Sequence, residues 1–320
     1  MKTQSLFFIL IISAVLMFLK TNANKNDVFS GASANISIEN LKDSVSNSSS
    51  LPKNPLSYPV KFSASSAISN SSEIFDDENS KISCAVSISA KAGLAKYIDQ
   101  NKNTFEFNEK NVLPIASVSK LMTALVAMEK ISGDKEIRLS EKAVNTEGIA
   151  GEFVVNELFR AKDLIKAALA VSSNDAAAAL AESFGEKKFV EAMNKKAEDL
   201  NMKNAYFMEP TGLSLLNQST AVDLAKLVSY IYYNKPEILE ITSQKEKNIF
   251  DLEKGKFKKL VNTNIFAGNA DFIGGKTGFL NEDTGRNLAA LFLKNGRVVL
   301  TVVLGSENAF EETKKLLTCF

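Results

Sequence analysis

The amino-acid sequence predicts an α/β protein of the α+β type, with one antiparallel sheet flanked by helices and an all-helical insert. Strand-like patterns stand at both ends of the folded region, and the last two are joined by Asn295-Gly296, a dipeptide typical of tight hairpins. Apolar residues at helical spacing fill the middle of the chain. We therefore expect one sheet that is completed by the C-terminal strands and covered by helices.

The first 81 residues have the features of an export signal and a linker. Residues 1–23 contain Lys2 and an apolar run from Leu6 to Leu19, which is shorter than a membrane-spanning helix prefers and predicts a cleaved signal peptide. Lys20 follows this run, so an uncleaved N-terminal membrane anchor is the alternative. Residues 24–81 are rich in Ser and Asn and predict a disordered linker. We expect an exported protein, in the periplasm or at the outer face of the cytoplasmic membrane.

Residues 82–320 are expected to form one domain that begins with two strands. Cys84–Ser89 alternates apolar and polar residues, which is typical of a half-buried strand. After a polar loop containing Lys91-Ala92-Gly93, a return strand is expected at Thr104–Phe107.

The central helix is expected to begin at or just after Ser117. Pro114 lies just upstream, and Leu121, Leu125 and Met128 recur at helical spacing among good helix formers. We expect this apolar stripe to face the core.

Further helices and strands follow from the same patterns. Thr220-x-x-Asp223 resembles a capping box at the start of one helix. The expected helices are Lys162–Ala170, Asp175–Phe184, Glu186–Leu200, Thr220–Tyr233 and about residues 307–317. The expected strands are Asp271–Gly278, Asn287–Lys294 and Arg297–Gly305.

The composition excludes several classes of function. With 38 Lys and Arg against 37 Asp and Glu, the chain lacks the basic excess that is typical of nucleic-acid-binding proteins. The absence of histidine excludes Ser-His-Asp and Cys-His catalysis and nearly every catalytic zinc site. Cys84 and Cys319 are the only thiols, too few for a cysteine metal cluster, so we expect no metal and no cofactor. The two cysteines either pair or remain buried thiols, and their spacing leaves both alternatives open.

Ser117 and Lys120 stand three positions apart at the start of the central helix. The first helical turn leaves backbone N–H groups unpaired, and side chains three positions apart share one face. Alone, the pair is typical of an ordinary helix start, with Ser117 as N-cap and Lys120 in solvent. In a hydrolase without histidine, however, the base must be Lys, Asp, Glu or Tyr.

Two further motifs change this interpretation. Ser172-Ser173-Asn174 precedes an expected helix, where such residues alone would be an ordinary N-cap. Lys276-Thr277-Gly278 lies on an expected strand, where a lysine alone is an ordinary edge residue. The order Ser-x-x-Lys, Ser-x-Asn, Lys-Thr-Gly, each on the fitting element, is the motif set of penicillin-recognising serine enzymes.

From about Cys84 to Phe320 the chain resembles the serine D-Ala-D-Ala carboxypeptidases, the low-molecular-weight penicillin-binding proteins of peptidase S11 type. Further similar stretches are Leu113–Ser117, Leu121–Ala124, Asn174–Ala177, Met193-Asn194, Glu209–Ser214, Ser219–Ala221, Asn262–Asn264 and Val303–Ser306. The resemblance implies a β-lactamase/transpeptidase-like sandwich. It also implies that peptidoglycan stem peptides are cleaved through an acyl-enzyme, without a cofactor, and that β-lactam antibiotics are covalent inhibitors.

The resemblance assigns catalytic roles to four residues. Ser117 is expected to attack the D-alanine carbonyl, and Lys120 to take its proton, which requires burial and a nearby cation to lower the pKa of this lysine. Ser172 is expected to relay a proton to the leaving amine. Asn174 is expected to hold Lys120 and the substrate amide.

Substrate binding is expected along the strand Lys276, Thr277, Gly278 and Phe279. An edge strand lets a peptide pair as an added strand, and the lysine also supplies the cation near Lys120. The backbone N–H groups of Ser117 and Phe279 are the expected oxyanion hole.

One position departs from the family pattern. Carboxypeptidases of this family commonly have an arginine before the last helix that binds the terminal carboxylate of the substrate, whereas this chain has Ala309. Lys276 and Thr277 are candidates for that contact, and so is Arg286. Losing the contact would also suit an enzyme that cuts cross-links inside a peptide.

Three alternatives to a carboxypeptidase are considered. Glu209–Ser214 and Phe279 resemble the D-Ala-D-Ala endopeptidase branch. A class A-like β-lactamase needs a glutamate that activates the deacylating water, whereas Glu209 precedes Pro-Thr-Gly in the peptidase pattern. An inactive wall-binding module is disfavoured because the full set of catalytic groups is present.

Overall fold

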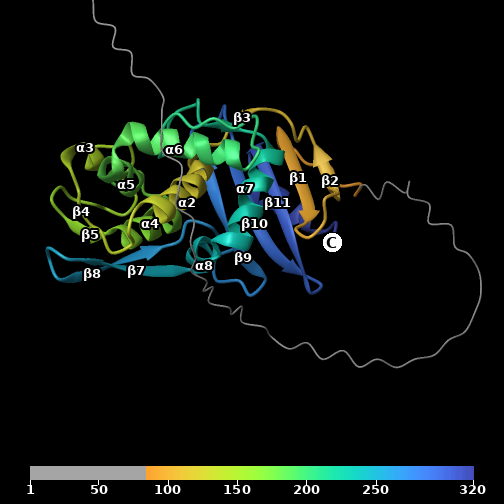
Figure 1. Cartoon of the computed structure of the whole chain (residues 1–320). Helices are drawn as coiled ribbons and strands as arrows, with labels where there is room; N and C mark the ends of the chain where they lie inside the picture. Colours follow the sequence, from red (N-terminus) through yellow and green to blue (C-terminus); the bar gives the residue numbers. More distant parts are fainter. Residues whose placement is uncertain (1–83) are drawn as a thin grey trace, which may run out of the picture. The chain divides into compact units, whose positions relative to one another are not determined.

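The computed structural model describes residues 84–320, so the predicted signal peptide at 1–23 and linker at 24–81 lie outside the described residues. Its framework is a five-stranded antiparallel sheet in the order β2-β1-β11-β10-β9 (Figure 1). These strands are β1 (Ala92–Tyr97), β2 (Phe105–Phe107), β9 (Phe272–Phe279), β10 (Arg286–Lys294) and β11 (Arg297–Ser306). Strand β9 lies at the sheet edge, so its outer side is not paired with another strand of this sheet.

Helices occupy the middle of the chain and its C-terminal end, as predicted. They are η1 (Ala116–Ser119), α2 (Lys120–Lys130), α3 (Glu141–Val144), α4 (Ala161–Ala170), α5 (Asn174–Phe184), α6 (Glu186–Asp199), α7 (Ala221–Asn234), α8 (Glu237–Ser243) and α9 (Ala309–Leu317). The predicted helices and C-terminal strands end within two residues of the observed bounds. Within residues 84–320, none of the helices is long and apolar enough to cross a membrane.

Three short strand pairs were not predicted. They are β3 (Leu113–Pro114) with β6 (Gln218–Ser219), β4 (Glu136–Arg138) with β5 (Leu158–Arg160), and β7 (Glu246–Asp251) with β8 (Lys256–Val261). In Figure 1 the β7–β8 hairpin extends along the helical part of the domain.

The sheet has a hydrophobic core on each face, because its side chains alternate between the two faces. On β11, Leu300 and Val302 join the larger core with residues of α2, α4 and α7. Val303 joins a smaller core with Ala309 and Leu316 of α9. Helices therefore cover both faces, which confirms the predicted fold class.

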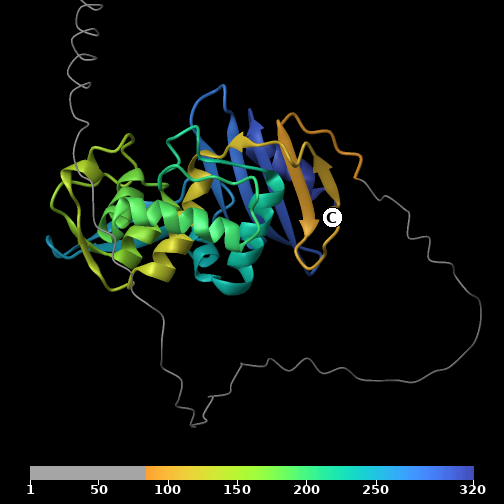
Figure 2. The ribbon, with the colours of Figure 1, turned by 45° about the horizontal axis from the view of Figure 1, so that its top comes forward.

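Helix α2 lies between the sheet and the helical insert, as the two views show (Figure 1, Figure 2). Leu121 and Leu125 of the predicted apolar stripe are 1% and 0% exposed, whereas Met128 is partly buried against the same core. Burying such side chains stabilises the fold by about 1.5–3 kcal/mol each. This packing fixes the helix start where Ser117 stands.

The prediction for the first strand was wrong. Cys84–Ser89 is extended but lies outside the sheet, and β1 is formed by Ala92–Tyr97, part of which was expected to be a loop. Cys84–Ser89 does alternate between half-buried and exposed positions. Its backbone instead bonds elsewhere, for example from the Ser89 N–H to the Glu312 carboxylate at 3.1 Å. The alternation of apolar and polar residues therefore predicted half-burial of this segment correctly, but it did not predict which segment pairs in the sheet.

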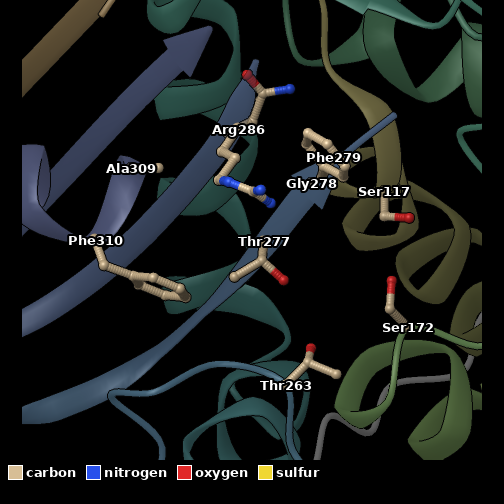
Figure 3. Close-up of a pocket in the computed structure, with 10 residues that line it drawn as sticks. Ser117, Ser172, Thr263, Thr277, Gly278, Phe279, Arg286, Ala309 and Phe310 are labelled. Atoms are coloured by element: carbon tan, nitrogen blue, oxygen red, sulfur yellow. The ribbon is translucent and has the colours of Figure 1, made fainter. Parts of the chain in front are cut away.

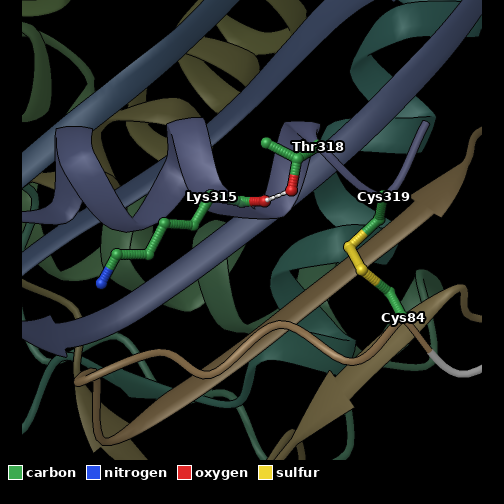
Figure 4. The surroundings of a disulfide bond; sticks show 4 residues. All are labelled: Cys84, Lys315, Thr318 and Cys319. Carbon is green, nitrogen blue, oxygen red and sulfur yellow. Dashed lines mark hydrogen bonds between the residues drawn. A yellow bond between two sulfur atoms is a disulfide. The ribbon is translucent and has the colours of Figure 1, made fainter.

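Cys84 and Cys319 form a disulfide that joins the start of the described chain to its last turn (Figure 4). The two Cα atoms lie 5.5 Å apart across a sequence separation of 235 residues. A cross-link over so long a loop removes much conformational freedom from the unfolded chain. In both overall views the C-terminus lies beside β1 and β2.

We predict that the double variant Cys84→Ser/Cys319→Ser unfolds more easily than the wild type, with a loss of about 2–5 kcal/mol in the free energy of unfolding. Chemical denaturation with and without a thiol reductant measures this loss. Reductant is expected to weaken the wild type and leave the double variant unchanged. Equal stability of the oxidised wild type and the double variant would contradict a stabilising role.

Candidate active site

Ser117 lies in the η1 turn directly after Ala116, whose backbone has a φ of 50°. Positive φ values are costly for residues other than glycine and tend to occur at functional sites. Lys120 begins α2, and its Nζ lies 2.9 Å from Ser117 Oγ. The three-residue spacing thus brings the two predicted side chains into contact.

Two glycines let other backbone segments pack directly on this turn. A Cβ at Gly278 of β9 would lie 2.6 Å from the carbonyl oxygen of Ile115. A Cβ at Gly212 would lie 2.3 Å from the carbonyl oxygen of Ala116. Both separations are too short for real atoms, so the absence of side chains allows β9 and the loop around Gly212 to approach Ser117.

Lys120 is fully buried, and its amine is surrounded by oxygen acceptors. Nζ donates to Asn174 Oδ1 at 2.6 Å and to the carbonyl oxygen of Thr211. Asn174 Nδ2 donates to the carbonyl oxygen of Glu147 at 2.6 Å, which fixes the amide with its oxygen toward Lys120. Burial, followed by the charge of Lys276, holds the pKa of Lys120 well below its usual range.

Lys276 is the second buried lysine, with an exposed fraction of 2%. Burial lowers its pKa to about 7. Its Nζ donates to Ser172 Oγ at 3.0 Å and to the carbonyl oxygen of Thr277 at 2.9 Å. Both partners are uncharged, so no carboxylate neutralises this cation directly.

The polar residues at the start of α5 have two roles: one caps the helix, and the other two face the site. Ser173 is the N-cap, and its side chain accepts from the Ala176 N–H at 3.2 Å. Ser172 has a φ of 61°, and its hydroxyl points toward that of Ser117 (Figure 3). Ser172 and Asn174 therefore both face the buried lysines, as the motif predicted.

The loop 209–217 supplies a contact that was not predicted. The Glu209 carboxylate accepts from three backbone N–H groups of the loop and from Asn217 Nδ2 at 3.0 Å. These bonds hold the loop so that the Thr211 carbonyl faces Lys120. Glu209 raises the pKa of Lys120, but this effect is smaller than those of burial and of Lys276. In the sequence, the Glu-Pro-Thr-Gly stretch marked this loop as similar to the family, but it did not indicate that the Thr211 carbonyl contacts Lys120.

A cavity of about 270 Å³ opens beside the two serines (Figure 3). Its lining residues are Ser117, Ser172, Thr263, Thr277, Gly278, Phe279, Arg286, Asn287, Ala309 and Phe310. The three residues Thr277, Gly278 and Phe279 of the predicted substrate strand are thus brought to the same space as both hydroxyls. Arg286, one of the carboxylate candidates, also lines it, whereas Thr263 and Phe310 were not predicted as site residues.

A serine hydroxyl bonded to a buried lysine of low pKa, beside the edge strand of a sheet, is typical of a serine hydrolase site that works without histidine. The family model of D-alanyl-D-alanine carboxypeptidases, peptidase S11, matches residues 70–308. The chain therefore belongs to this family.

Curated relatives carry both peptidase names of the family. A D-alanyl-D-alanine endopeptidase of Escherichia coli is 33% identical over 238 residues, which are 71% of this chain and 76% of that protein. A Pseudomonas aeruginosa protein of the same name is 42% identical over 43% of this chain and 46% of its own length. The D-alanyl-D-alanine carboxypeptidase DacF of Bacillus subtilis is 30% identical over 76% and 64%, respectively. The last two matches thus span less than two thirds of those relatives.

Solved structures agree with the fold. Penicillin-binding protein D2 of Listeria monocytogenes, in its ampicillin-bound form, matches 72% of this chain and 96% of its own with a TM-score of 0.64 and 30% identity. A D-alanyl-D-alanine carboxypeptidase of Mycobacterium tuberculosis matches 72% of this chain and 90% of its own with a TM-score of 0.66 at 22% identity, which supports the fold alone. At the level of the family, the predictions of the fold and of a serine-type D-Ala-D-Ala carboxypeptidase are confirmed.

We predict that Lys276→Gln moves the acid limb of the acylation rate to higher pH. A lysine base must be neutral, so acylation rises with pH through the pKa of Lys120, and removing the neighbouring cation raises that pKa. The measurement is the rate of penicillin acylation across pH, whose midpoint is independent of the overall loss in rate.

Lys276→Arg is the matched control, because it keeps a cation and is expected to keep the acid limb near its original pH. An unchanged midpoint in Lys276→Gln would show that Lys276 does not set the pKa of Lys120.

Proposed function

We propose that the chain removes the terminal D-alanine from peptidoglycan stem peptides through an acyl-enzyme on Ser117. The observation that carries this proposal is the contact of 2.9 Å between Ser117 Oγ and Lys120 Nζ, inside a buried network that lowers the pKa of the lysine. Family membership supports the substrate class, and the ampicillin-bound relative supports binding of β-lactams.

The hydrogen bonds of Lys120 indicate where its lone pair points. A neutral amine has two N–H groups and one lone pair. The Asn174 and Thr211 oxygens can only accept, so they use the two N–H groups. The lone pair is then left for the Ser117 hydroxyl, which can donate. A neutral Lys120 is thus oriented as the base for Ser117.

Acylation then proceeds with all protons accounted for. Ser117 Oγ bonds to the substrate carbonyl carbon while its proton passes to Lys120, and the backbone N–H groups of Ser117 and Phe279 stabilise the oxyanion. The C–N bond breaks as the leaving amine takes a proton from Ser172, which in turn takes one from Lys276 at 3.0 Å. The proton that Lys120 took from Ser117 then passes to Lys276, so that Lys120 is neutral again before deacylation.

Deacylation uses the same groups with water as the co-reactant. Water adds to the ester carbonyl and gives a proton to Lys120, and the C–O bond to Ser117 breaks as Lys120 passes that proton to Ser117 Oγ. The product is a shortened peptide with a new carboxylate.

A D-Ala-D-Ala endopeptidase is the second candidate. The Escherichia coli and Pseudomonas aeruginosa relatives carry that name. Ala309 lines the cavity with only a methyl group, where family carboxypeptidases commonly have an arginine. A small residue leaves space for a substrate that continues beyond the cut bond.

We also propose that residues 82–320 are the catalytic domain of an exported enzyme, acting in the periplasm or at the outer face of the cytoplasmic membrane. The signal-like residues 1–23 support export. N-terminal sequencing of the mature protein tests this proposal. A start near residue 24 means a cleaved signal, and a start at Met1 means an N-terminal membrane anchor.

We predict that Ser117→Ala abolishes both penicillin labelling and D-alanine release, because it removes the hydroxyl that contacts Lys120 and is proposed to form the acyl bond. Intact-mass spectrometry and D-alanine assays measure the two losses, and an unchanged melting temperature shows that the fold is intact. A penicilloyl adduct on the variant would identify a different nucleophile.

We predict that Lys120→Arg lowers the acylation rate by about 10²- to 10⁴-fold, since a guanidinium keeps the charge but does not act as a base. Stopped-flow acylation measures the rate, with Lys166→Arg on the partly exposed surface of α4 as the matched control. A near wild-type rate would mean that another group activates Ser117.

A further inference from the structure

Arg286 carries the one charged side chain among the residues that line the cavity in the described part of the chain. It stands at the start of β10, directly opposite Phe279 of β9. Its guanidinium carbon lies 4.1 Å from the centre of the Phe279 ring, and stacking of this kind fixes the plane of the guanidinium. Figure 3 shows this group directed toward Thr277.

The guanidinium of Arg286 is only weakly paired. Its nearest ionic contact in residues 84–320 is Glu282, at 3.6 Å, and the Glu282 side chain is 81% exposed. This distance is beyond hydrogen-bonding range, and so exposed a pair contributes little. Most of the five N–H donors of Arg286 are thus available to an anion in the cavity.

Lys276 is less suited to hold a substrate anion. Its amine is buried and already donates to Ser172 Oγ and to the Thr277 carbonyl. Its pKa of about 7 also leaves it partly neutral near pH 7. A guanidinium keeps its charge, and its planar fork matches the two oxygens of a carboxylate.

We propose, on the basis of the function proposed above, that Arg286 and Thr277 bind the carboxylate on the carbon that carries the leaving amine. This anchor places the arginine on β10 instead of before the last helix, where the cavity is lined by the small side chain of Ala309.

The anchor separates three substrate classes by whether the carbon of the leaving amine carries a carboxylate. In a peptide that ends in D-alanine, the carbon of the leaving amine carries a carboxylate and a methyl group. In a cross-link to the D-centre of meso-diaminopimelate, it carries a free carboxylate and a longer chain, for which the space at Ala309 provides room. A cross-link to the ε-amine of lysine has no carboxylate there. The site therefore accepts the first two classes and disfavours the third.

The first test compares an acyl-D-Ala-D-Ala peptide with the same peptide ending in a carboxamide. The full-length wild type is expected to prefer the acid by about 10- to 100-fold in kcat/KM, the contribution of a charge-assisted contact. Arg286→Gln is expected to bring this ratio close to one, and Arg286→Lys to restore part of it.

Arg297→Gln is the matched control. Arg297 also stacks on an aromatic ring, that of Tyr97 at 3.6 Å, and pairs with Asp99, but it does not line the cavity. This variant is expected to keep the preference for the acid. The anchor would be overturned if Arg286→Gln kept the wild-type ratio of kcat/KM between acid and carboxamide, whether or not both values fell.

The second test uses two muropeptide dimers, one cross-linked through meso-diaminopimelate and one through the ε-amine of lysine. The wild type is expected to cut the first at least about 10-fold faster, and Arg286→Gln to remove that difference. Equal rates for both dimers in the wild type would overturn the anchor as the basis of selectivity. If the wild type releases no D-alanine from any peptide, the proposed function itself fails. If the wild type does release D-alanine, but Arg286→Gln keeps both the acid-to-carboxamide ratio and the ratio between the two dimers, only the anchor fails.

Discussion

Two buried lysines beside each other, Lys120 and Lys276, are the constraint on which the rest of the structure depends. Taking an ammonium group out of water disfavours its charged form, and a second cation nearby adds to that effect. The fold satisfies both amines with hydroxyl, amide and carbonyl oxygens rather than with carboxylates, as their hydrogen bonds show. A carboxylate partner would stabilise the charged form and remove the base. Neutral acceptors hold the amine in place, while burial and the charge of Lys276 keep the pKa of Lys120 low.

This constraint explains why the surrounding backbone is so closely packed. The acceptors come from the loop before α5, the loop at Thr211 and strand β9, which meet at the Ser117 turn only because Gly212 and Gly278 have no side chains. Glu209 is the nearby carboxylate that could raise the pKa of Lys120. Its oxygens are occupied by hydrogen bonds from its own loop, so it orders the Thr211 carbonyl and has only a minor effect on Lys120.

The parts of the site that were predictable are those set by local geometry or by short motifs. Ser117 and Lys120 could be paired from sequence because positions three apart on a helix start must lie close together. The Thr211 carbonyl could not be predicted, because a backbone atom has no residue-type signal and its position depends on how Glu209 folds the loop. The same limit applied to Cys84 and Cys319, whose pairing depends on where the two ends of the domain meet. At Cys84–Ser89 an alternating pattern was mistaken for a sheet strand, since a segment packed beside a sheet shows the same alternation.

The arrangement also bears on which group activates the deacylating water. A class A-like β-lactamase needs a free carboxylate near the acyl ester. Among the residues that line the cavity in the described chain there is no aspartate or glutamate, and Glu209 is engaged in its loop. This agrees with the proposal that Lys120, whose lone pair faces Ser117, is the base for both half-reactions. In the proposed mechanism water attacks the ester from the side on which Lys120 can take its proton, so a group that remains in that space slows hydrolysis. A peptide acyl group whose leaving amine has departed vacates the cavity next to Arg286 and Ala309. In the proposed mechanism an opened β-lactam, which keeps its leaving nitrogen attached, would still fill that cavity and so hinder hydrolysis of its ester.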